Sequence, residues 1–300
     1  MESTDVRWRE RSRLVRAARL WRTRNPHTFR DKVRYKMLRD HSPLVVTFAD
    51  KAAVRGYVAN VIGPQYLPHA YVITADPSVL LGVALPDAYV VKPTHGSGAA
   101  IVVSGRGSVE ARLPSVPGDW SYQHVRPEFA SRDDIARICR GWLRQLYGQG
   151  PNREWVYGRI PPQIIVEEML ADADGAIPAD YKFFVFHGTC AYVQVDGGRF
   201  DRRTQDFFRP DWTHVPLSGG PPWADPEPGR PACMDEMIEV AQRLGADTDF
   251  VRVDLYDVGG RVVFGELTSF PAGGDSRFDP ECFDEEFGRH WTVPRRYVTR

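Results

Sequence analysis

The sequence predicts a mixed α/β fold in which short strands alternate with amphipathic helices. Two apolar strand patterns, at 89–92 and 101–103, enclose a glycine-rich stretch at 93–98 that no regular element would tolerate. Helical periodicity follows at 131–148, and again at 234–245 before a final pair of strands. With 300 residues, 42% of them hydrophobic, the chain is large enough to bury one extended core or two smaller ones.

The predicted helices have recognisable ends. Asp50 is placed to cap a helix that carries the apolar residues of 53–61 on one face. Ser131 and Asp134 form a capping box at the start of the next helix, and Gly148 is expected to end it. Gly245 is expected to end the helix that begins at 234.

Further segments have the composition of strands, namely 164–166, 181–186, 190–195, 250–256 and 261–267. The pair 181–186 and 190–195 meets at His187-Gly188, and the last pair meets at Gly259-Gly260, which predicts two antiparallel hairpins. Residues 201–231, rich in Pro, Gly and Trp, predict a long irregular loop that is either functional or disordered.

Composition narrows the class of protein. No apolar run approaches the roughly 18 residues of a membrane span, and the N-terminus has no pattern of a signal peptide, so we expect a cytoplasmic protein. The four cysteines are scattered without the paired spacing of a zinc or redox site. Reduced, packed thiols are therefore expected.

The net charge of zero hides a strongly basic N-terminus. Residues 1–40 contain thirteen Arg or Lys and five Asp or Glu, a net charge of +8. Such a segment suits an acidic membrane surface, a nucleic acid or an anionic polymer. The alternative, which we favour, is an amphipathic helix with a solvated charged face, because Leu14, Ala17, Ala18 and Trp21 recur at helical spacing.

A possible metal site is formed by the last hairpin. Alternation along a strand puts Arg252 and Asp254 on one face, and Glu266 and Thr268 on one face of the partner strand. Two carboxylates beside an arginine suit Mg²⁺ with a bound triphosphate. For one such pair alone, a solvated ion-pair ladder is the simpler explanation.

The hairpin loop decides whether these carboxylates meet. A two-residue turn at Gly259-Gly260 would pair Asp254 with Gly265 and place Glu266 on the opposite face. A three-residue loop with Gly260 as a bulge would bring Asp254 within a diagonal step of Glu266. The metal hypothesis requires the second arrangement.

Lys92 and the loop after it suit phosphate binding. Glycines let backbone N–H groups approach an anion, and a lysine at a strand end supplies a point charge. The alternatives are a plain hairpin connection and, for His95, an ordinary loop residue. The pattern is not a Walker A loop, because Lys92 precedes the glycines.

Two other places carry polar residues at strand ends. Glu167 and Glu168 follow a buried strand pattern, where they would present backbone groups and a carboxylate to an adenine or a ribose. Asp180 and Lys182 share one face of the next strand and would meet a ribose and a phosphate. An exposed salt bridge explains the second pair equally well.

In its order of motifs the sequence resembles the ATP-grasp superfamily and, in detail, the TupA-like ATP-grasp family, which is associated with polysaccharide and teichuronopeptide assembly. The resemblance runs through residues 25–29, 49–58, 91–98, 164–168, 180–184, 250–256 and 264–268. It implies an ATP-grasp fold of two α+β subdomains with ATP held between them. We expect a basic helical segment at 1–48, the smaller subdomain at 49–166 and the larger one at 167–300.

The resemblance also implies roles for individual residues. Phosphate and nucleotide contacts fall to Lys51, Lys92, His95, Gly96, Ser97, Gly98, Glu167, Glu168, Met169 and Asp180. Lys182 and Arg252 would stabilise the transferred phosphoryl group and a substrate carboxylate. Asp254 and Glu266 would bind Mg²⁺, and the third ligand is Thr268, where many ATP-grasp enzymes have Asn, or a water.

The implied activity is a carboxylate-amine ligase that uses ATP and Mg²⁺ and passes through an acyl-phosphate, in polysaccharide, cell-envelope or natural-product biosynthesis. Its partners would be a small-molecule or polymer-linked carboxylate and an amine. No nucleic acid is expected, and surface association through the basic N-terminus stays open. A kinase acting on a small molecule or sugar and a non-catalytic nucleotide-binding module are the alternatives.

Overall fold

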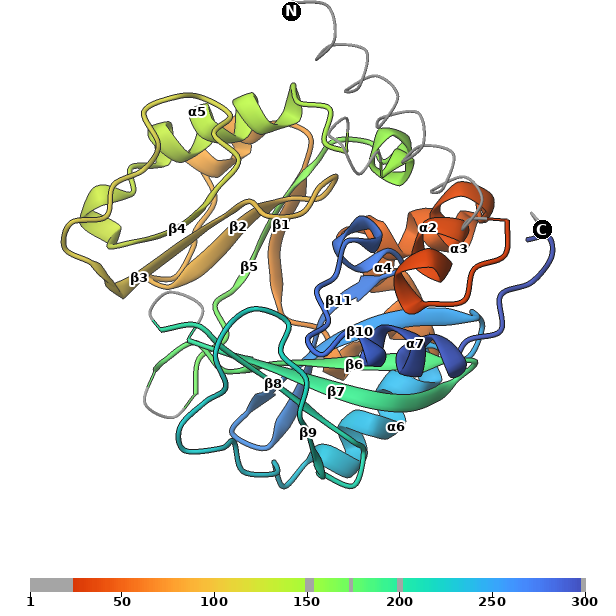
Figure 1. Ribbon diagram of the computed structural model, residues 1–300. Coiled ribbons are helices and arrows are strands. Elements are labelled where there is room, and N and C mark those ends of the chain that lie inside the picture. Colours follow the sequence, from red (N-terminus) through yellow and green to blue (C-terminus); the bar gives the residue numbers. More distant parts are fainter. Residues whose placement is uncertain (1–23, 149–153, 173–174, 199–201, 298–300) are drawn as a thin grey trace, which may run out of the picture.

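The computed structural model describes residues 24–148, 154–172, 175–198 and 202–297. The helix expected around Leu14 to Trp21 lies outside these ranges. Two separate sheets dominate the fold, one in the upper left of Figure 1 and one below it. Within the described residues, no helix is long and apolar enough to cross a membrane.

The first sheet has five strands in the order β1-β5-β2-β3-β4. They are β1 (Ala70–Thr74), β2 (Tyr89–Pro93), β3 (Ala100–Ser108), β4 (Tyr122–Val125) and β5 (Ile164–Glu168). The predicted antiparallel pair around the glycine-rich stretch is confirmed as β2 and β3. Neither β1 nor β4 is expected from the sequence, because both are short edge strands that lack the continuous burial of β2 and β5.

The second sheet has six strands in the order β11-β10-β6-β7-β8-β9. They are β6 (Asp180–Phe186), β7 (Thr189–Gly197), β8 (Thr204–Phe208), β9 (His214–Val215), β10 (Phe250–Val258) and β11 (Arg261–Thr268). Both predicted hairpins are confirmed. The long loop predicted at 201–231 is wrong in part, because residues 204–208 and 214–215 add two strands to this sheet.

Six α-helices cover the sheets in the described part of the chain. They are α2 (Phe29–Arg39), α3 (Pro43–Ala49), α4 (Ala53–Val61), α5 (Arg132–Leu143), α6 (Met234–Leu244) and α7 (Cys282–Arg289). Short 3₁₀ helices lie at η1 (Pro64–Tyr66), η2 (Pro77–Leu81), η3 (Pro127–Phe129), η4 (Trp155–Arg159) and η5 (Pro271–Gly274). Ser131 is confirmed as the N-cap, since its Oγ accepts from the N–H of Asp134 and donates to the Asp134 carboxylate. Helix α5 ends at Leu143 and not at Gly148.

The helices pack on the two sheets and form separate hydrophobic cores with them. Apolar residues of α5 pack on the five-stranded sheet. Helices α4 and α6 pack on one face of the six-stranded sheet, and α2 and α7 cover part of its other face. Residues 29–61 therefore share cores with the six-stranded sheet. The predicted subdomain boundaries at residues 48 and 166 stay a prediction. They place α4 in the smaller subdomain, whereas α4 packs on the six-stranded sheet, which they place in the larger one.

Candidate functional site

A polar cleft lies between the two sheets, on the part of the six-stranded sheet that α2 and α7 leave uncovered. It has a volume of about 320 Å³. Its lining residues come from both sheets, from the segment between α3 and α4, from the loop between β2 and β3 and from the residue before β8. They are Lys51, Lys92, Ser97, Gly98, Ala99, Tyr122, Asp180, Lys182, Gln194, Asp196, Arg203, Arg252, Asp254, Tyr256, Gly265 and Glu266. Residues far apart in the sequence, predicted separately as phosphate and metal contacts, thus face one space.

The hairpin of β10 and β11 brings the two predicted metal carboxylates together by an unexpected route. Its turn has two residues, because Val258 pairs with Arg261, so the three-residue loop is wrong. A register shift between Leu255 and Asp254 then places Asp254 opposite Glu266. Gly265 is the extra residue of this β-bulge. A Cβ atom on Gly265 would lie only 2.8 Å from the ring of Tyr256 and 3.0 Å from the carbonyl oxygen of Asp254, so the bulge requires glycine.

Asp254 is buried at the centre of a charged network. Arg252 donates to both of its carboxylate oxygens at 2.7 Å, and Lys182 Nζ donates to Oδ2 at 2.8 Å. Lys182 also forms an ion pair with Asp180. Burial alone would raise the pKa of Asp254, but the charges of Arg252 and Lys182 outweigh it and the pKa is lowered. The carboxylate therefore stays ionised within its cationic surroundings.

Lysine 182 keeps its charge for the complementary reason. Burial lowers its pKa, but the carboxylates of Asp254 and Asp180 raise it more, so the net shift is upward. The pKa of Arg252 is likewise raised by Asp254 and Glu266 against the effect of burial. Two permanent cations thus stand beside the two carboxylates predicted to bind Mg²⁺.

Glu266 is the more accessible of those carboxylates. Its oxygens lie 3.9 Å from Lys51 Nζ and 4.0 Å from Arg252 Nη2. Thr268 Oγ1, the predicted third ligand, accepts from Arg252 at 3.1 Å. In the described residues, no three His, Cys, Asp or Glu side chains are grouped to hold a metal. The available oxygen donors nevertheless fit Mg²⁺, which commonly takes one or two carboxylates together with phosphate oxygens.

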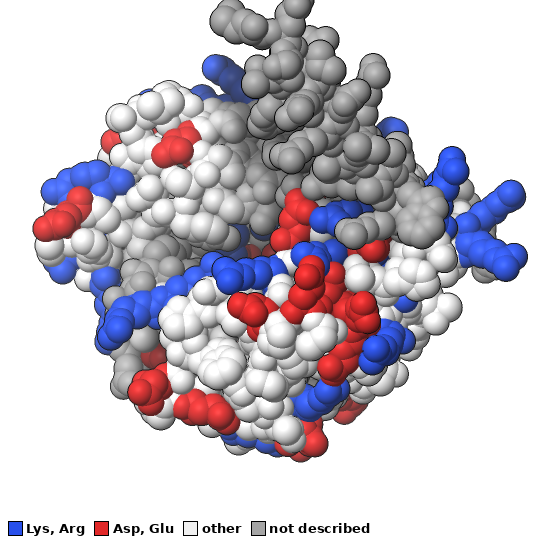
Figure 2. Space-filling view, in the orientation of Figure 1, with Lys and Arg blue, Asp and Glu red and all other residues white. Residues whose placement is uncertain are grey.

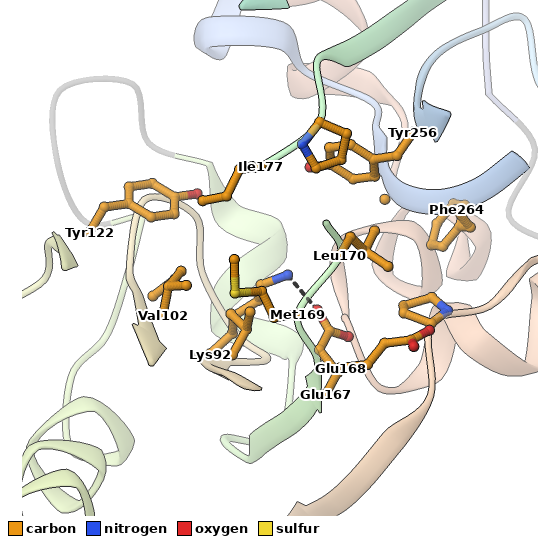
Figure 3. A pocket seen from close by; sticks show the side chains of 15 residues that line it. Lys92, Val102, Tyr122, Glu167, Glu168, Met169, Leu170, Ile177, Tyr256 and Phe264 are labelled. Carbon is orange, nitrogen blue, oxygen red and sulfur yellow. Dashed lines mark hydrogen bonds and ion pairs between the residues drawn. The ribbon is translucent and has the colours of Figure 1, made fainter. Parts of the chain in front are cut away.

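Lys92 and Glu167 point toward one another beside a second, smaller pocket (Figure 3). They form an ion pair, and Arg55 Nη1 of α4 lies 3.9 Å from the other oxygen of Glu167. Arg55 also donates to the carbonyl of Pro68 at 2.7 Å. The carboxylate of Glu167 is thus paired with Lys92.

The smaller pocket, of about 70 Å³, is largely apolar and adjoins the cleft. The apolar side chains that line it include Val90, Val102, Met169, Leu170, Ile177 and Phe264 (Figure 3). Lys92, Tyr122, Tyr256 and Gly265 line both spaces. An apolar slot that opens into a charged cleft matches the shape and polarity of a nucleoside polyphosphate.

Strand pairing limits which main-chain groups of residues 167–170 can contact a ligand in this slot. Strand β5 lies between β1 and β2, so the backbone of Glu167 faces partners on both sides. The N–H of Glu168 donates to the carbonyl of His69, and its carboxylate accepts from the N–H of His69. Met169 and Leu170 follow the strand and line the slot, so their main-chain groups lie beside it.

The glycine-rich loop divides into two halves. Ser97 and Gly98 line the cleft. His95 is only 2% exposed, its Nε2 lies 3.1 Å from the carbonyl oxygen of Trp142, and Gly96 is buried beside it. Burial lowers the pKa of His95, which favours the neutral ring. The structure therefore places His95 and Gly96 behind the cleft lining, and Ser97 and Gly98 in it.

Several lining residues are not among the predicted ones. Gln194, Asp196 and Arg203 come from β7 and the segment before β8, and Arg203 Nη2 lies 3.5 Å from Asp196. The sequence predicts a loop around Arg203, so the positive charge of its side chain is the one signal that could have identified it as a site residue. In Figure 2, basic side chains form a band across this face between the upper and lower parts of the molecule. Such a band attracts anionic ligands.

Glu154 adds a further acidic group that the prediction omits. Burial, together with the negative charge of Glu266, raises its pKa to about 7. Nothing in its local sequence marks it, because its environment is created by η4 and by a strand more than 100 residues away.

The match to known families settles the class of this protein. Residues 125–292, more than half of the chain, match the family described as TupA-like ATPgrasp. The chain belongs to the TupA-like ATP-grasp family. The predicted α/β ATP-grasp fold is thereby confirmed, with β6, β7, β10 and β11 inside the matched range. No curated protein matches the sequence.

Solved structures of ATP-grasp ligases are similar to this chain at low sequence identity. An L-amino acid ligase from Bacillus licheniformis is 12% identical, with a TM-score of 0.43 over 77% of this chain and 46% of that one. A D-alanine-D-alanine ligase from Helicobacter pylori is 11% identical, with a TM-score of 0.44 over 82% and 62% of the two chains. The ATP-grasp ligase PsnB, complexed with minimal precursor, Mg and ADP, is 12% identical, with a TM-score of 0.36 over 76% and 52%.

The TupA-like chain thus spans about half to six-tenths of the length of these structures. What this chain binds and which reaction it performs rest on its own cleft.

Proposed function

We propose that this TupA-like protein is an ATP-dependent ligase that joins a carboxylate to an amine through an acyl-phosphate. The observation that carries the proposal is the single cleft in which Lys51, Lys92, Lys182 and Arg252 surround the pair Asp254 and Glu266. A triphosphate needs several cations and a metal-binding carboxylate pair within a short distance, and this cleft supplies both. Its substrates would belong to polysaccharide, cell-envelope or natural-product biosynthesis.

The apolar slot is proposed to hold adenine, with main-chain groups from Met169 onward reading its edge. Lys92 would then give up or share its ion pair with Glu167 to contact a phosphate. Asp180, on the six-stranded sheet, would face the ribose. The N–H groups of Ser97 and Gly98 would contact the phosphates from the other sheet. The proposed subdomains, 49–166 and 167–300, would close on the nucleotide from two sides.

Lys182 and Arg252 are proposed to act on the reacting groups. The substrate carboxylate forms a bond to the terminal phosphorus while the bond to ADP breaks, and the amine then displaces phosphate from the acyl carbon. The products are an amide, ADP and inorganic phosphate. Both cations are held by carboxylates before reaction, so little reorganisation is needed when charge develops. When bound by Asp254 and Glu266, Mg²⁺ would neutralise phosphate charge.

Trapping with hydroxylamine tests the proposed reaction, because this small nucleophile intercepts acyl-phosphates. With Mg·ATP and a panel of sugar acids and amino acids, we expect a hydroxamate from at least one acid, with stoichiometric ADP. Formation of AMP and pyrophosphate would instead indicate an adenylating enzyme. Phosphorylation of a hydroxyl compound, with no hydroxamate from any acid, would indicate a kinase.

Nucleotide binding should raise the thermal stability of the protein, because a ligand that binds only the folded state stabilises it. Mg·ATP at 100 times its Kd would contribute about 2.7 kcal/mol. Lys92→Ala should reduce the ATP-induced shift in Tm with or without Mg²⁺. Asp254→Ala should reduce it mainly when Mg²⁺ is present.

Differential scanning fluorimetry measures these shifts, with each variant compared with its own ligand-free Tm. Arg289→Ala is the control, because its side chain is 76% exposed and pairs only with Glu285 on α7 among the described residues. ATP-induced shifts in Lys92→Ala and Asp254→Ala that equal those of the control would contradict the site assignment.

A further inference from the structure

The back of the glycine-rich loop is held by an aromatic residue that the proposed function does not use. Trp120 lies just before β4, and its indole N–H donates to the carbonyl of Ser97 at 2.6 Å. Its ring stacks on Tyr147, with ring centroids 5.2 Å apart and an interplanar angle of 25°. The indole therefore joins the loop to the segment that follows α5.

Trp120 is itself fixed from behind by α5 and its neighbours. The indole N–H of the fully buried Trp142 donates to the carbonyl of Asp119 at 2.8 Å, next to Trp120 in the chain. His95 meets the ring of Trp120 edge-on at 5.7 Å. Because Trp142 belongs to the core under the five-stranded sheet, the position of Trp120 is set by the rigid part of the fold.

The two carbonyls at the centre of the loop both accept hydrogen bonds, one from Trp120, which does not line the cleft, and one from Lys51, which does. Trp120 binds the Ser97 carbonyl, and Lys51 Nζ donates to the Gly96 carbonyl at 2.6 Å. In contrast, the N–H groups of Ser97, Gly98 and Ala99 have no acceptor among the described residues, and these three residues line the cleft. A loop held in this way keeps these N–H groups available as donors to an anionic ligand.

Gly96 shows how closely the indole is fitted to the loop. A Cβ atom added there would overlap Trp120 Cζ2 and lie 2.9 Å from Tyr147 Cγ. Any side chain at position 96 would therefore push the loop away from the two rings.

We propose that Trp120 is a positioning residue for polyphosphate binding, which turns the N–H groups of the glycine-rich loop toward the cleft by holding the Ser97 carbonyl from behind. The proposal rests on the proposed function only in taking this cleft as the nucleotide site. It predicts that Trp120 acts on phosphate groups and not on the base, because the apolar slot is lined by other residues.

Trp120→Phe tests this, since it keeps an aromatic ring and removes the indole N–H. Without this bond the ligand must order the loop itself, at a cost of up to one hydrogen bond or about 5-fold in affinity, so titration calorimetry with Mg²⁺ should show ATP binding weakened about 5-fold. ADP should be weakened less, and AMP less than 2-fold. Inorganic tripolyphosphate, which lacks a base, should be weakened as much as ATP.

Trp223→Phe is the matched control. The indole N–H of Trp223 donates to the carbonyl of Leu217 at 3.1 Å, so the same bond is lost in a segment that does not line the cleft. This variant should bind every ligand within 2-fold of wild type. Equal weakening of ATP and AMP in Trp120→Phe, or no weakening of either, would overturn the proposal.

A double-mutant cycle with Gly96→Ala gives a second measurement. The added methyl group collides with the part of the indole that phenylalanine lacks, so Gly96→Ala should weaken tripolyphosphate binding at least 3-fold less in Trp120→Phe than in wild type. Additive effects would contradict the contact. If tripolyphosphate binding depends on Trp120 but no acid gives a hydroxamate, the role of Trp120 stands and the ligase proposal is refuted. If the wild-type protein binds no tripolyphosphate, the role of Trp120 is refuted.

Discussion

Arg252→Ala should lower the catalytic rate by about 10² to 10³, the usual cost of one preorganised contact to a transition state. Affinity for ATP should change much less, because Lys51, Lys92 and Lys182 line the same cleft. The large loss of rate is expected because Arg252 is held in a fixed position: it donates to both oxygens of Asp254 at 2.7 Å and to Thr268 at 3.1 Å. Hydroxamate formation under saturating ATP measures the rate, and calorimetry measures the affinity.

Loss of Arg252 also removes a partner of the buried Asp254, so folding must be checked separately. Arg252→Lys keeps the charge but not the two-pronged contact, and should recover only part of the rate. Arg289→Ala on α7 should leave the rate unchanged. If Arg252→Ala weakened ATP binding as strongly as it lowered the rate, Arg252 would be a nucleotide-binding residue and not one that acts in the transition state.

Phe29→Ala should reduce the free energy of unfolding by about 3 to 5 kcal/mol, the cost of a large cavity in a packed core. Phe29, in the first turn of α2, has no exposed surface. Its ring centroid lies 5.1 to 6.1 Å from the rings of six other aromatic residues: Phe184, Phe186, Phe250, Phe278, Phe287 and Trp291. Urea unfolding followed by circular dichroism measures the change.

Leu38→Ala on the same helix provides the control, because Leu38 is 55% exposed and its loss should change stability by less than about 0.5 kcal/mol. A loss below about 1 kcal/mol for Phe29→Ala would show that α2 is not part of the core of the six-stranded sheet. That result would favour the predicted separate segment at 1–48.

The sequence predicts local structure well where one periodic pattern is sufficient. Alternation and a turn at His187-Gly188 identify the hairpin of β6 and β7, and both turn residues have positive φ. Apolar spacing identifies α6 with its end at Leu244. Strands β1 and β4 are not predicted from the sequence, because an edge strand needs a partner to pair with and no strong sequence pattern of its own.

The bulge at Gly265 illustrates what pattern alone does not determine. The turn at Gly259-Gly260 has two residues, and regular pairing from that turn would separate Asp254 from Glu266. One extra residue, accommodated because glycine has no side chain to meet Tyr256 and the Asp254 carbonyl, restores the pair. Register depends on packing along the whole hairpin, which a local pattern does not contain.

The residue types of the candidate site could be predicted from the sequence, since lysines, carboxylates and glycines at strand ends carry their chemistry wherever the chain places them. Motif order was sufficient for the family and therefore for the fold. Only the tertiary structure decided which groups meet: the engagement of Glu167 by Lys92 and Arg55, the burial of His95, and the hold of Trp120 on Ser97. These contacts join segments 23 to 112 residues apart, so they arise from sheet pairing and core packing and not from any local signal.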